Sequence, residues 1–341
     1  MIYPNNKTHR RNLPLLSGIA LGLAVGSTQA AILEEVMVTA QKREQNIQDV
    51  GISITAFTGD QLKNLGIVNT VDITQQVPAL QMQTFSPAFT IINLRGISQN
   101  NFQDNLEAPV AVYVDGAYVP SMNAINAQLF DVERVEVLRG PQGTLFGRNT
   151  TGGLLHFLTK GATSEALNGY LEAQVGDYDM RLLEGAIGGA LSDNVRGRLA
   201  GRWMENDGYV ESLTPGVRDA HGADGYSVRG ALQIDFTENF LADVRVVTSA
   251  DKDVPSGTFS VDFTSFDPNT GLGVNAPGRL TDKLDHASSF EGRYDRDSVN
   301  ATTTLTWTLN DSVELTSITN YFDLEKKYLE DAGGGLFFFP Y

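Results

Sequence analysis

The chain of 341 residues contains no cysteine and only four histidines. The absence of cysteine excludes both a disulfide framework and a thiolate metal site. The histidines stand far apart, and no H-E-x-x-H motif places two of them on one helix face. The sequence therefore predicts no catalytic residues, no metal site and no resident cofactor, and we do not expect an enzyme.

Basic residues are also scarce. Lysine and arginine number 25 against 41 acidic residues, which gives a net charge of −16. Nucleic-acid binding depends on a basic face, so this class of partner is excluded. The chain also lacks an apolar run of about 18 residues, the length of a membrane helix. If it enters a membrane, it must do so as a closed barrel.

The first thirty residues differ from the rest. A basic start with Lys7, Arg10 and Arg11 precedes an apolar stretch from Leu13 to Val25, and small residues precede a cut after Ala30. This order is typical of a secretory signal peptide. We expect residues 1–30 to be a signal and the mature chain to be exported.

Residues 48–161 have the pattern of a compact α+β domain. Strands are expected in "GISITAF" (51–57), "TIINLRG", "PVAVYVDG", "VERVEVLRG" and "GLLHFLTK". Thr58 and Gln61 form a capping box before a short helix that Gly66 ends, and "NTVDITQQVP" predicts a second helix. Asp115-Gly116 predicts a tight hairpin.

From residue 168 onward the pattern changes to long alternating strands. We expect seven of them, over residues 168–177, 180–191, 195–204, 225–236, 240–249, 298–309 and 313–325. One face of these strands is apolar, and the other carries Arg196, Arg198, Arg202 and Arg229. An arginine facing lipid would cost about 2–4 kcal/mol at the bilayer midplane, so in a membrane barrel these arginines would face inward.

The predicted connections separate by length. Three-residue turns alternate with the long connections 205–224 and 250–297, and only 178–179 departs from the pattern. Short turns at one end and long loops at the other are typical of outer-membrane barrels. A secreted β-rich adhesin or interaction module with one core face and one solvent face remains the alternative.

One block of the sequence resembles a known family. "DVERVEVLRGPQGTLFGRNTTGGLLHFLTK" (131–160), preceded by "NLRGIS" and "APVAVYVDGAYVP", is similar to the plug of TonB-dependent outer-membrane receptors. The resemblance implies an α+β plug domain (48–161) followed by an antiparallel transmembrane β-barrel (162–341). Residues 31–47 would be the TonB box and linker.

The resemblance also implies roles for particular residues. "EEVMVTA" resembles the TonB box, so Glu35, Val36, Met37, Val38, Thr39 and Ala40 would bind the periplasmic protein TonB. This stretch alternates like a strand, and we expect it to find no pairing partner within the chain, with "QKREQN" as a solvated tether. Plug–barrel contacts would come from Arg95 and Arg139, whose glutamate partners in the family lie beyond residue 341. Ligand contacts are expected in the plug loops 81–88 and 99–107, at Gln99, Asn100, Asn101 and Phe102.

Two further motifs have simple explanations. The glycine-rich "GPQGTLFGRNTTGG" lacks both phosphate-binding signatures and is explained by tight turns. The pieces "DKD" (251–253) and "YDRD" (294–297) could bind a hard cation, but we interpret them as solvated loops. His156 replaces a residue that is usually small in the family, and we assign no metal to it.

Together these features predict a receptor for energy-coupled import across the outer membrane of a Gram-negative cell, in contact with outer-membrane lipids. A ferric siderophore is the expected ligand. The seven predicted strands are fewer than the about 22 that surround a plug. We therefore expect an incomplete barrel, from a truncated gene or a partial sequence, that does not transport on its own.

Overall fold

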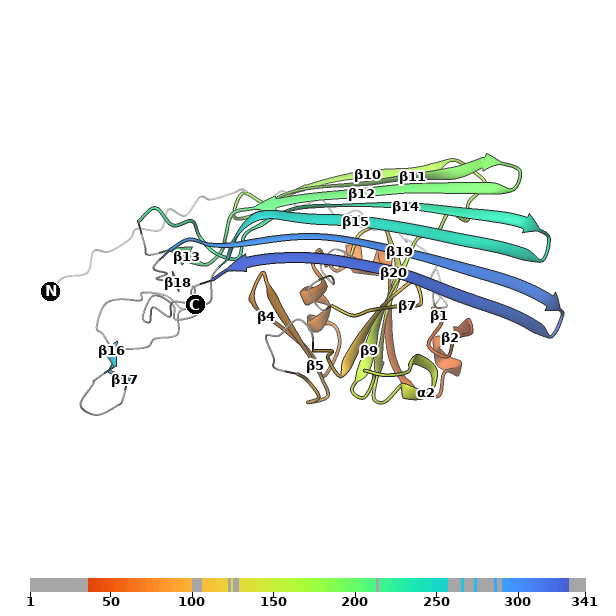
Figure 1. Cartoon of the computed structure of the whole chain (residues 1–341), viewed down its shortest axis with the longest axis horizontal. Helices are drawn as coiled ribbons and strands as arrows, with labels where there is room; N and C mark the ends of the chain where they lie inside the picture. The colour runs from red at the N-terminus through yellow and green to blue at the C-terminus, as the bar shows by residue number, and fades with distance from the viewer. Residues whose placement is uncertain are drawn as a thin grey trace, which may run out of the picture. The chain divides into compact units, whose positions relative to one another are not determined.

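The structure is a computed structural model, and it describes residues 36–99, 106–121, 124, 129–212, 215–256, 265–266, 273–274, 285–286 and 290–330. The predicted signal lies outside the described residues. Two parts follow in sequence, a small α+β domain and a large antiparallel sheet (Figure 1).

A five-stranded sheet forms the centre of the first part. Its order is β3-β8-β9-β6-β7, with β3 Ser53–Thr58, β6 Val110–Val114, β7 Ala117–Val119, β8 Val132–Arg139 and β9 Gly153–Thr159. Strands β6 and β9 are parallel, whereas the other pairs are antiparallel. The predicted Asp115-Gly116 hairpin joins β6 to β7, and both turn residues have positive φ.

Short helices and one hairpin surround this sheet. Helix α1 (Gly59–Asn64) begins at the predicted capping box, in which Thr58 and Gln61 exchange side-chain to backbone bonds. The second predicted helix is a 3-10 helix, η2 (Thr70–Gln75). Two shorter helices are η1 (Ile47–Asp49) and α2 (Gly143–Phe146). Strands β4 (Leu80–Ser86) and β5 (Phe89–Leu94) pair separately as a hairpin, and the sequence predicted only β5.

Buried aliphatic side chains fill both faces of the central sheet. Val135 and Val137 of β8 pack on one face, together with Val112, Leu155 and Phe157. The opposite face carries Leu138, Tyr113, Phe146 and Leu154. This alternation along β8 leaves the polar side chains of Arg134 and Glu136 on the second face, where they are buried.

The large sheet is a meander of seven antiparallel strands in the order β10-β11-β12-β14-β15-β19-β20. Their bounds are Asn168–Val175, Arg181–Ser192, Val195–Asn206, Ala223–Thr237, Phe240–Ser256, Gly292–Asn310 and Val313–Leu329. All seven predicted strands are confirmed. In the described residues β10 and β20 are the edges of an open sheet, so the prediction of an incomplete barrel is confirmed as well.

Two strands run further than the sequence predicted. The segments "DKD" and "YDRD" were interpreted as solvated loops, but they lie inside β15 and β19. There Asp251 and Arg296 are register partners. The interpretation was wrong because cross-strand ion pairs allow charged residues to continue a ladder. Beyond these strand ends lie the short pairs β13 (Glu211–Ser212) with β18 (Asp285–His286) and β16 (Ser265–Phe266) with β17 (Gly273–Val274).

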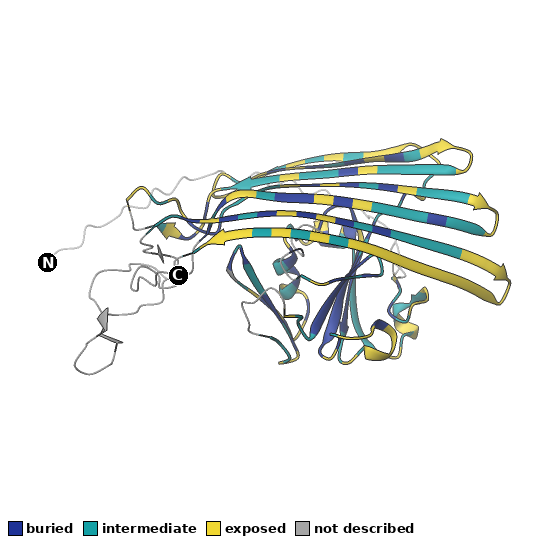
Figure 2. Cartoon of the chain, in the orientation of Figure 1, coloured by how far each residue is buried: buried dark blue, intermediate teal, exposed yellow. Residues whose placement is uncertain are grey.

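Burial alternates along the large sheet (Figure 2). On β14 the side chains of Ser227, Arg229 and Ala231 are buried, whereas those between them are exposed or half-buried. Large apolar side chains dominate the exposed positions, among them Leu171, Ile187, Leu199, Leu232, Phe236 and Trp307. The sheet therefore has one apolar outer face and one inner face that other parts of the chain cover.

The segment that resembles the TonB box does have a partner in this chain. Strand β1 (Met37–Val38) pairs antiparallel with β2 (Gln45–Asn46), and the amide of Ile47 donates to the carbonyl of Val36 at 3.0 Å. The prediction that it pairs with nothing in the chain was wrong, whereas Lys42, Arg43 and Glu44 of "QKREQN" are exposed as expected of a solvated tether. A turn at Thr39–Lys42 folds the tether back, and Val38 and Ala40 then bury their side chains completely on the plug.

Within the part of the chain that the structure describes, no helix combines the length and apolarity required to cross a membrane.

Candidate functional site

An ion pair joins the inner face of the large sheet to the α+β domain. Arg198 of β12 donates to both carboxylate oxygens of Asp131, at 2.7 and 2.5 Å. Asp131 precedes β8, and its side chain is 1% exposed while that of Arg198 is 8% exposed. This bidentate geometry is the strong form of an arginine–carboxylate contact. The amide of Asp131 also donates to Glu184 of β11 at 3.2 Å.

Two further arginines of the inner face bind backbone carbonyls of the same domain. Arg202 donates to Leu129 at 2.6 Å and to Val68 at 2.8 Å. Arg229, which is 3% exposed, donates to Phe130 at 3.1 Å and lies over its ring. The predicted inward orientation of the arginine face is confirmed for these residues and for Arg198. Arg196 instead pairs with Asp235 of the neighbouring strand at 2.5 Å.

The sequence analysis did not find a fourth contact. Arg245 of β15 binds Asp115 at 2.6 Å and the carbonyl of Thr159 at 2.9 Å. Asp115 was predicted only as a turn residue, yet its carboxylate also accepts from the amide and hydroxyl of Thr159. A lone arginine among the valines of "DVRVV" was the available signal.

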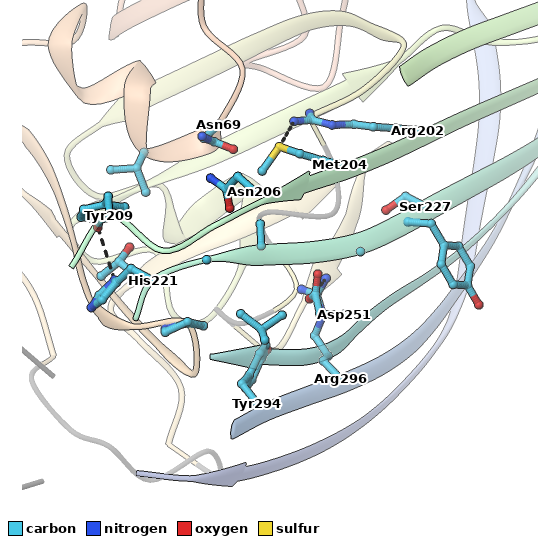
Figure 3. Close-up of a pocket in the computed structure, with 18 of the residues that line it drawn as sticks. Asn69, Arg202, Met204, Asn206, Tyr209, His221, Ser227, Asp251, Tyr294 and Arg296 are labelled. Carbon is cyan, nitrogen blue, oxygen red and sulfur yellow. Dashed lines mark hydrogen bonds and ion pairs between the residues drawn. The ribbon is translucent and has the colours of Figure 1, made fainter. Parts of the chain in front are cut away.

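A cavity of about 450 Å³ lies between the α+β domain and the inner face of the sheet (Figure 3). The domain lines it with Asn69, Val71, Asp72, Thr84 and Pro87. The strands line it at their ends opposite the short turns, mainly with Arg202, Met204, Asn206, Ser227, Asp251, Tyr294 and Arg296. The connection after β12 adds Tyr209 and His221.

The cavity wall combines fixed charge with polar groups. Arg296 pairs with Asp251 at 2.6 Å, so the wall carries a compensated charge pair. The hydroxyl of Tyr209 lies 3.3 Å from Nδ1 of His221. Burial raises the pKa of Tyr209, which keeps this hydroxyl neutral at physiological pH. The sequence analysis treated His221 as an isolated histidine, placed Asp251 and Arg296 in solvated loops, and did not single out Tyr209.

Two oxygen atoms in this region are buried without a hydrogen-bond donor among the described residues. They are Oγ1 of Thr84, from the domain, and Oδ1 of Asn206, from β12. Both residues line the cavity. A buried acceptor without a donor costs about 1–3 kcal/mol. Because both oxygens are inaccessible to solvent, a guest in the cavity would reach them only after a local rearrangement of the wall.

The loops that were expected to contact ligand are only partly described. Asn100, Asn101 and Phe102 lie outside the described residues, and Gln99 lies at the border of that gap. The stretch 81–88, expected to be a loop, is mostly strand β4 and supplies Thr84 and Pro87 to the cavity. At the tip of its hairpin Ala88 is fully buried against Val254 and Tyr294.

The structure brings together the two arginines that the family resemblance singled out. Arg95 has φ +55° and donates to Oγ of Ser53 at 3.1 Å. Arg139 donates to the carbonyl of Ile54 at 3.4 Å, and its Nε is buried with no acceptor in the described residues. Neither contacts a glutamate in the described part of the chain. Their predicted pairing with barrel glutamates therefore stays a prediction.

A buried carboxylate contacts the β1–β2 segment. It lies on the face of the central sheet that carries Leu138. Oε1 of Glu136, which is 0% exposed, accepts from the amide of Thr39 at 2.8 Å and from Nε of Arg134 at 2.9 Å. Its Oε2 lies 3.7 Å from Nδ1 of His156, longer than a hydrogen bond. Burial raises the pKa of Glu136, but the neighbouring His156, Thr39 and Arg134 outweigh it, and the pKa is lowered overall.

His156 has a structural explanation. It faces Glu136 across the β8–β9 ladder and Tyr113 across β6–β9, and its Nε2 accepts from the amide of Gly116 at 3.0 Å. No cluster of potential metal ligands occurs among the described residues.

A family model now assigns the first part of the chain. The model described as the TonB-dependent Receptor Plug Domain matches residues 46–154. The pesticin receptor of Yersinia pestis is 32% identical over 189 residues, which are 54% of this chain and 28% of that receptor. The vitamin B12 transporter BtuB of Vibrio vulnificus is 28% identical over 211 residues, or 59% of this chain and 32% of that protein. The chain thus spans about a third or less of the length of these relatives.

Solved structures share the fold of both parts. The ferric yersiniabactin uptake receptor FyuA from Yersinia pestis has a TM-score of 0.67 at 22% identity, over 81% of this chain and 41% of that chain. The complex of FpvAI with pyocin S2 has a TM-score of 0.66 at 18% identity, over 83% and 35%. At these identities the likeness concerns the fold alone.

The fold and the matched domain define a plug with part of an outer-membrane receptor barrel. Residues 46–154 match the plug domain of TonB-dependent receptors, and the pesticin receptor is similar to this chain, so the predicted resemblance to this family is confirmed. The relatives named above are receptors and a transporter, which confirms the prediction that the chain is not an enzyme.

Proposed function

We propose that this chain is the plug and part of the barrel wall of a receptor that imports a scarce ligand across the outer membrane with energy from TonB. The observation that carries the proposal is the matched plug domain, attached through Arg198, Arg202 and Arg229 to the inner face of an antiparallel sheet. A plug inside such a wall closes a pore that only a bound ligand and an external force would open.

The outer face of the sheet is suited to lipid. Leu171 is 79% exposed and Val175 is 85% exposed on β10, and similar side chains continue across the neighbouring strands. A contiguous apolar surface of this kind is avoided in proteins that stay in water. The proposed location is therefore the outer membrane of a Gram-negative cell, reached through the predicted signal peptide. The adhesin alternative would need a second covering layer on this face.

We assign the cavity beside Thr84 and Asn206 to the imported ligand. It lies at the strand ends opposite the short turns, which is the external side in this architecture. The names of similar proteins refer to yersiniabactin, pyoverdine and vitamin B12. Ferric siderophores are the more frequent cargo among them, and we propose a ferric siderophore here. Gln99 to Phe102 would contribute from the neighbouring plug loop.

The segment from Glu35 to Ala40 would bind TonB. Its alternation suits β-augmentation, in which a short strand extends the sheet of a partner through main-chain bonds. In the docked state Val38 and Ala40 are buried on the plug, and the ladder with β2 uses the same backbone. Binding of TonB therefore requires the segment to leave the plug first. No covalent chemistry is involved.

A binding measurement tests the ligand assignment. Purified receptor is titrated with a panel of ferric siderophores and with cyanocobalamin, and bound ligand is followed by quenching of tryptophan fluorescence. We expect a ferric siderophore to bind and Asn206→Leu to weaken it about tenfold, because Asn206 lies in the cavity. The control Asn194→Leu lies in an exposed short turn and should change nothing.

Binding of cyanocobalamin alone would overturn the siderophore assignment and keep the receptor assignment. Equal effects of the two variants on affinity would show that the ligand does not bind in this cavity. Recovery of the protein in the soluble fraction would favour the adhesin alternative and overturn the receptor.

A further inference from the structure

The contact between Glu136 and Thr39 links the plug core to the segment that faces the periplasm in the proposed function. Glu136 is at the centre of β8, and its side chain is fully buried. Thr39 directly follows β1 and is separated from Glu136 by 97 positions in the sequence. The contact joins the amide and the hydroxyl of Thr39 to one carboxylate oxygen, at 2.8 and 3.3 Å.

Arg134 completes the arrangement. Its Nε donates to the same oxygen of Glu136 at 2.9 Å, and its Nη2 lies 3.5 Å from the hydroxyl of Thr39. The guanidinium is 8% exposed, and the carboxylates of Glu136 and Glu133 both compensate its charge. Removing one member of a buried pair leaves the other uncompensated. Arg134, Glu136 and Thr39 therefore hold each other in place.

The rest of the docked segment contributes mainly apolar contacts. Val38 and Ala40 are buried against Leu138, Phe146 and Tyr113. Two small side chains bury little apolar area. A charge-assisted hydrogen bond in a buried site is of comparable strength. The carboxylate contact is therefore a large share of what retains the segment.

Glu136 can hold the segment without being essential to the plug fold. The other face of β8 carries the main aliphatic core, through Val135 and Val137. Oε2 of Glu136 has no hydrogen-bond donor among the described residues, and Oε1 is occupied by Thr39 and Arg134. The carboxylate thus accepts from Thr39 of the segment and from Arg134 of its own strand, and it joins the two.

We propose that Glu136 is the positioning residue that holds residues 36–40 on the plug and so sets how often the segment is free to bind a partner. The identity of that partner rests on the proposed function, but the docking equilibrium does not. If the contact between Glu136 and Thr39 is weakened, the segment should be free to bind a partner in a larger fraction of the molecules. If the contact is intact, the segment should become free only after the plug is disturbed.

The chain has no cysteine, so one introduced thiol reports on docking without background. Val38→Cys places it at a site that is 0% exposed when the segment is docked. Its reaction rate with a maleimide is measured in detergent with no TonB present. We expect Glu136→Gln to raise the rate about tenfold or more, because the amide presents donors to Arg134 and loses the charge.

Two comparison variants separate docking from folding. Thr39→Val keeps the shape but removes the hydroxyl contact, and we expect a rate increase of about fivefold. Glu133→Gln removes a half-exposed carboxylate that also contacts Arg134 but not Thr39, and it should leave the rate unchanged. A thiol at Val112→Cys in the core should remain unreactive in all three backgrounds.

Unchanged labelling in Glu136→Gln with a protected core would overturn the proposal. If the core thiol becomes reactive in that variant, Thr39→Val decides: faster labelling supports the proposal and unchanged labelling overturns it. None of these measurements depends on uptake. They would therefore still test the role of Glu136 if the proposed coupling to TonB were wrong.

Discussion

At the scale of single residues, a few buried polar groups attach the plug to its surroundings. Asp131 and Asp115 both have positive φ and place their carboxylates where Arg198 and Arg245 reach them. Aspartate tolerates this backbone region better than most residues. Arg198 was predicted from strand alternation, whereas Arg245 was not. Their acidic partners could not be predicted, because contacts across more than sixty positions leave no local pattern.

The ion pair between Arg198 and Asp131 should contribute strongly to stability. Arg198→Ala leaves the buried carboxylate uncompensated, and we expect a loss of about 3–5 kcal/mol in the free energy of unfolding. Arg148→Ala is the matched control, because its pair with Glu107 is mostly exposed and should contribute about 0–1 kcal/mol. Denaturant unfolding in detergent measures both. Equal losses of unfolding free energy in the two variants would contradict a strong contribution of the buried ion pair to stability.

Gly153 should tolerate no side chain. Its φ is +135°, and an added Cβ would lie 2.2 Å from the carbonyl oxygen of Leu138. We expect Gly153→Ala to destabilise the plug by at least about 2 kcal/mol. Gly51→Ala is the control, since an added Cβ there meets nothing within 4 Å. A thermal melt that ranks the two variants equally would show that β9 does not approach β8 this closely.

Docking of the segment should depend on pH through Glu136. Its pKa is lowered from the ordinary value in the folded plug by His156, Thr39 and Arg134, and only the bond from Thr39 belongs to the docked segment, so the ionised carboxylate favours docking. That contribution is lost only as pH falls through the lowered pKa. Arg134 and His156 are the charged or titratable groups that face it.

A spin label on Met37→Cys should therefore show constant mobility between about pH 5 and 8. It should become mobile only in stronger acid. Release between pH 6 and 7 would contradict control of docking by Glu136.

At the scale of elements, strands were predicted well where one face is apolar. All seven strands of the large sheet follow from alternation, because a period of two separates the two faces. Strand β4 was missed because "LQMQTFS" was assigned to an apical loop by analogy with the family. The ends of β15 and β19 were missed because the charged residues there were interpreted as parts of solvated loops. The docking of β1 was missed because its partner β2 has only two residues, too short to carry a pattern.

The two faces of β10 should respond differently to charge. Leu171→Arg places a cation on the apolar outer face, and we expect a cost of about 2–4 kcal/mol and reduced assembly in the outer membrane. Gln174→Arg lies on the opposite face of the same strand and should assemble normally. Heat-modifiable migration of the receptor from outer-membrane fractions measures assembly. Normal assembly of the Leu171→Arg variant would show that this face of β10 does not contact lipid.

At the scale of the whole molecule, the plug lies between two functional regions. On one side it shares a cavity with the wall through η2 and β4, and on the other it holds the β1–β2 segment through Glu136. Strand β8 lies between the wall and the segment, since Asp131 just before it binds Arg198 and Glu136 lies five positions later. In the proposed function, the plug would respond to ligand on one side and to a pulling partner on the other.

Energised uptake tests this central claim most directly. Val36→Pro removes a main-chain donor that a partner strand would need, but it keeps the carbonyl that the docked hairpin uses. Cells carrying the full-length receptor with this change should bind the ferric siderophore as the parent does, yet accumulate radioactive iron no faster than a strain without TonB. Uptake at the parental rate by the Val36→Pro receptor would contradict TonB coupling through this segment.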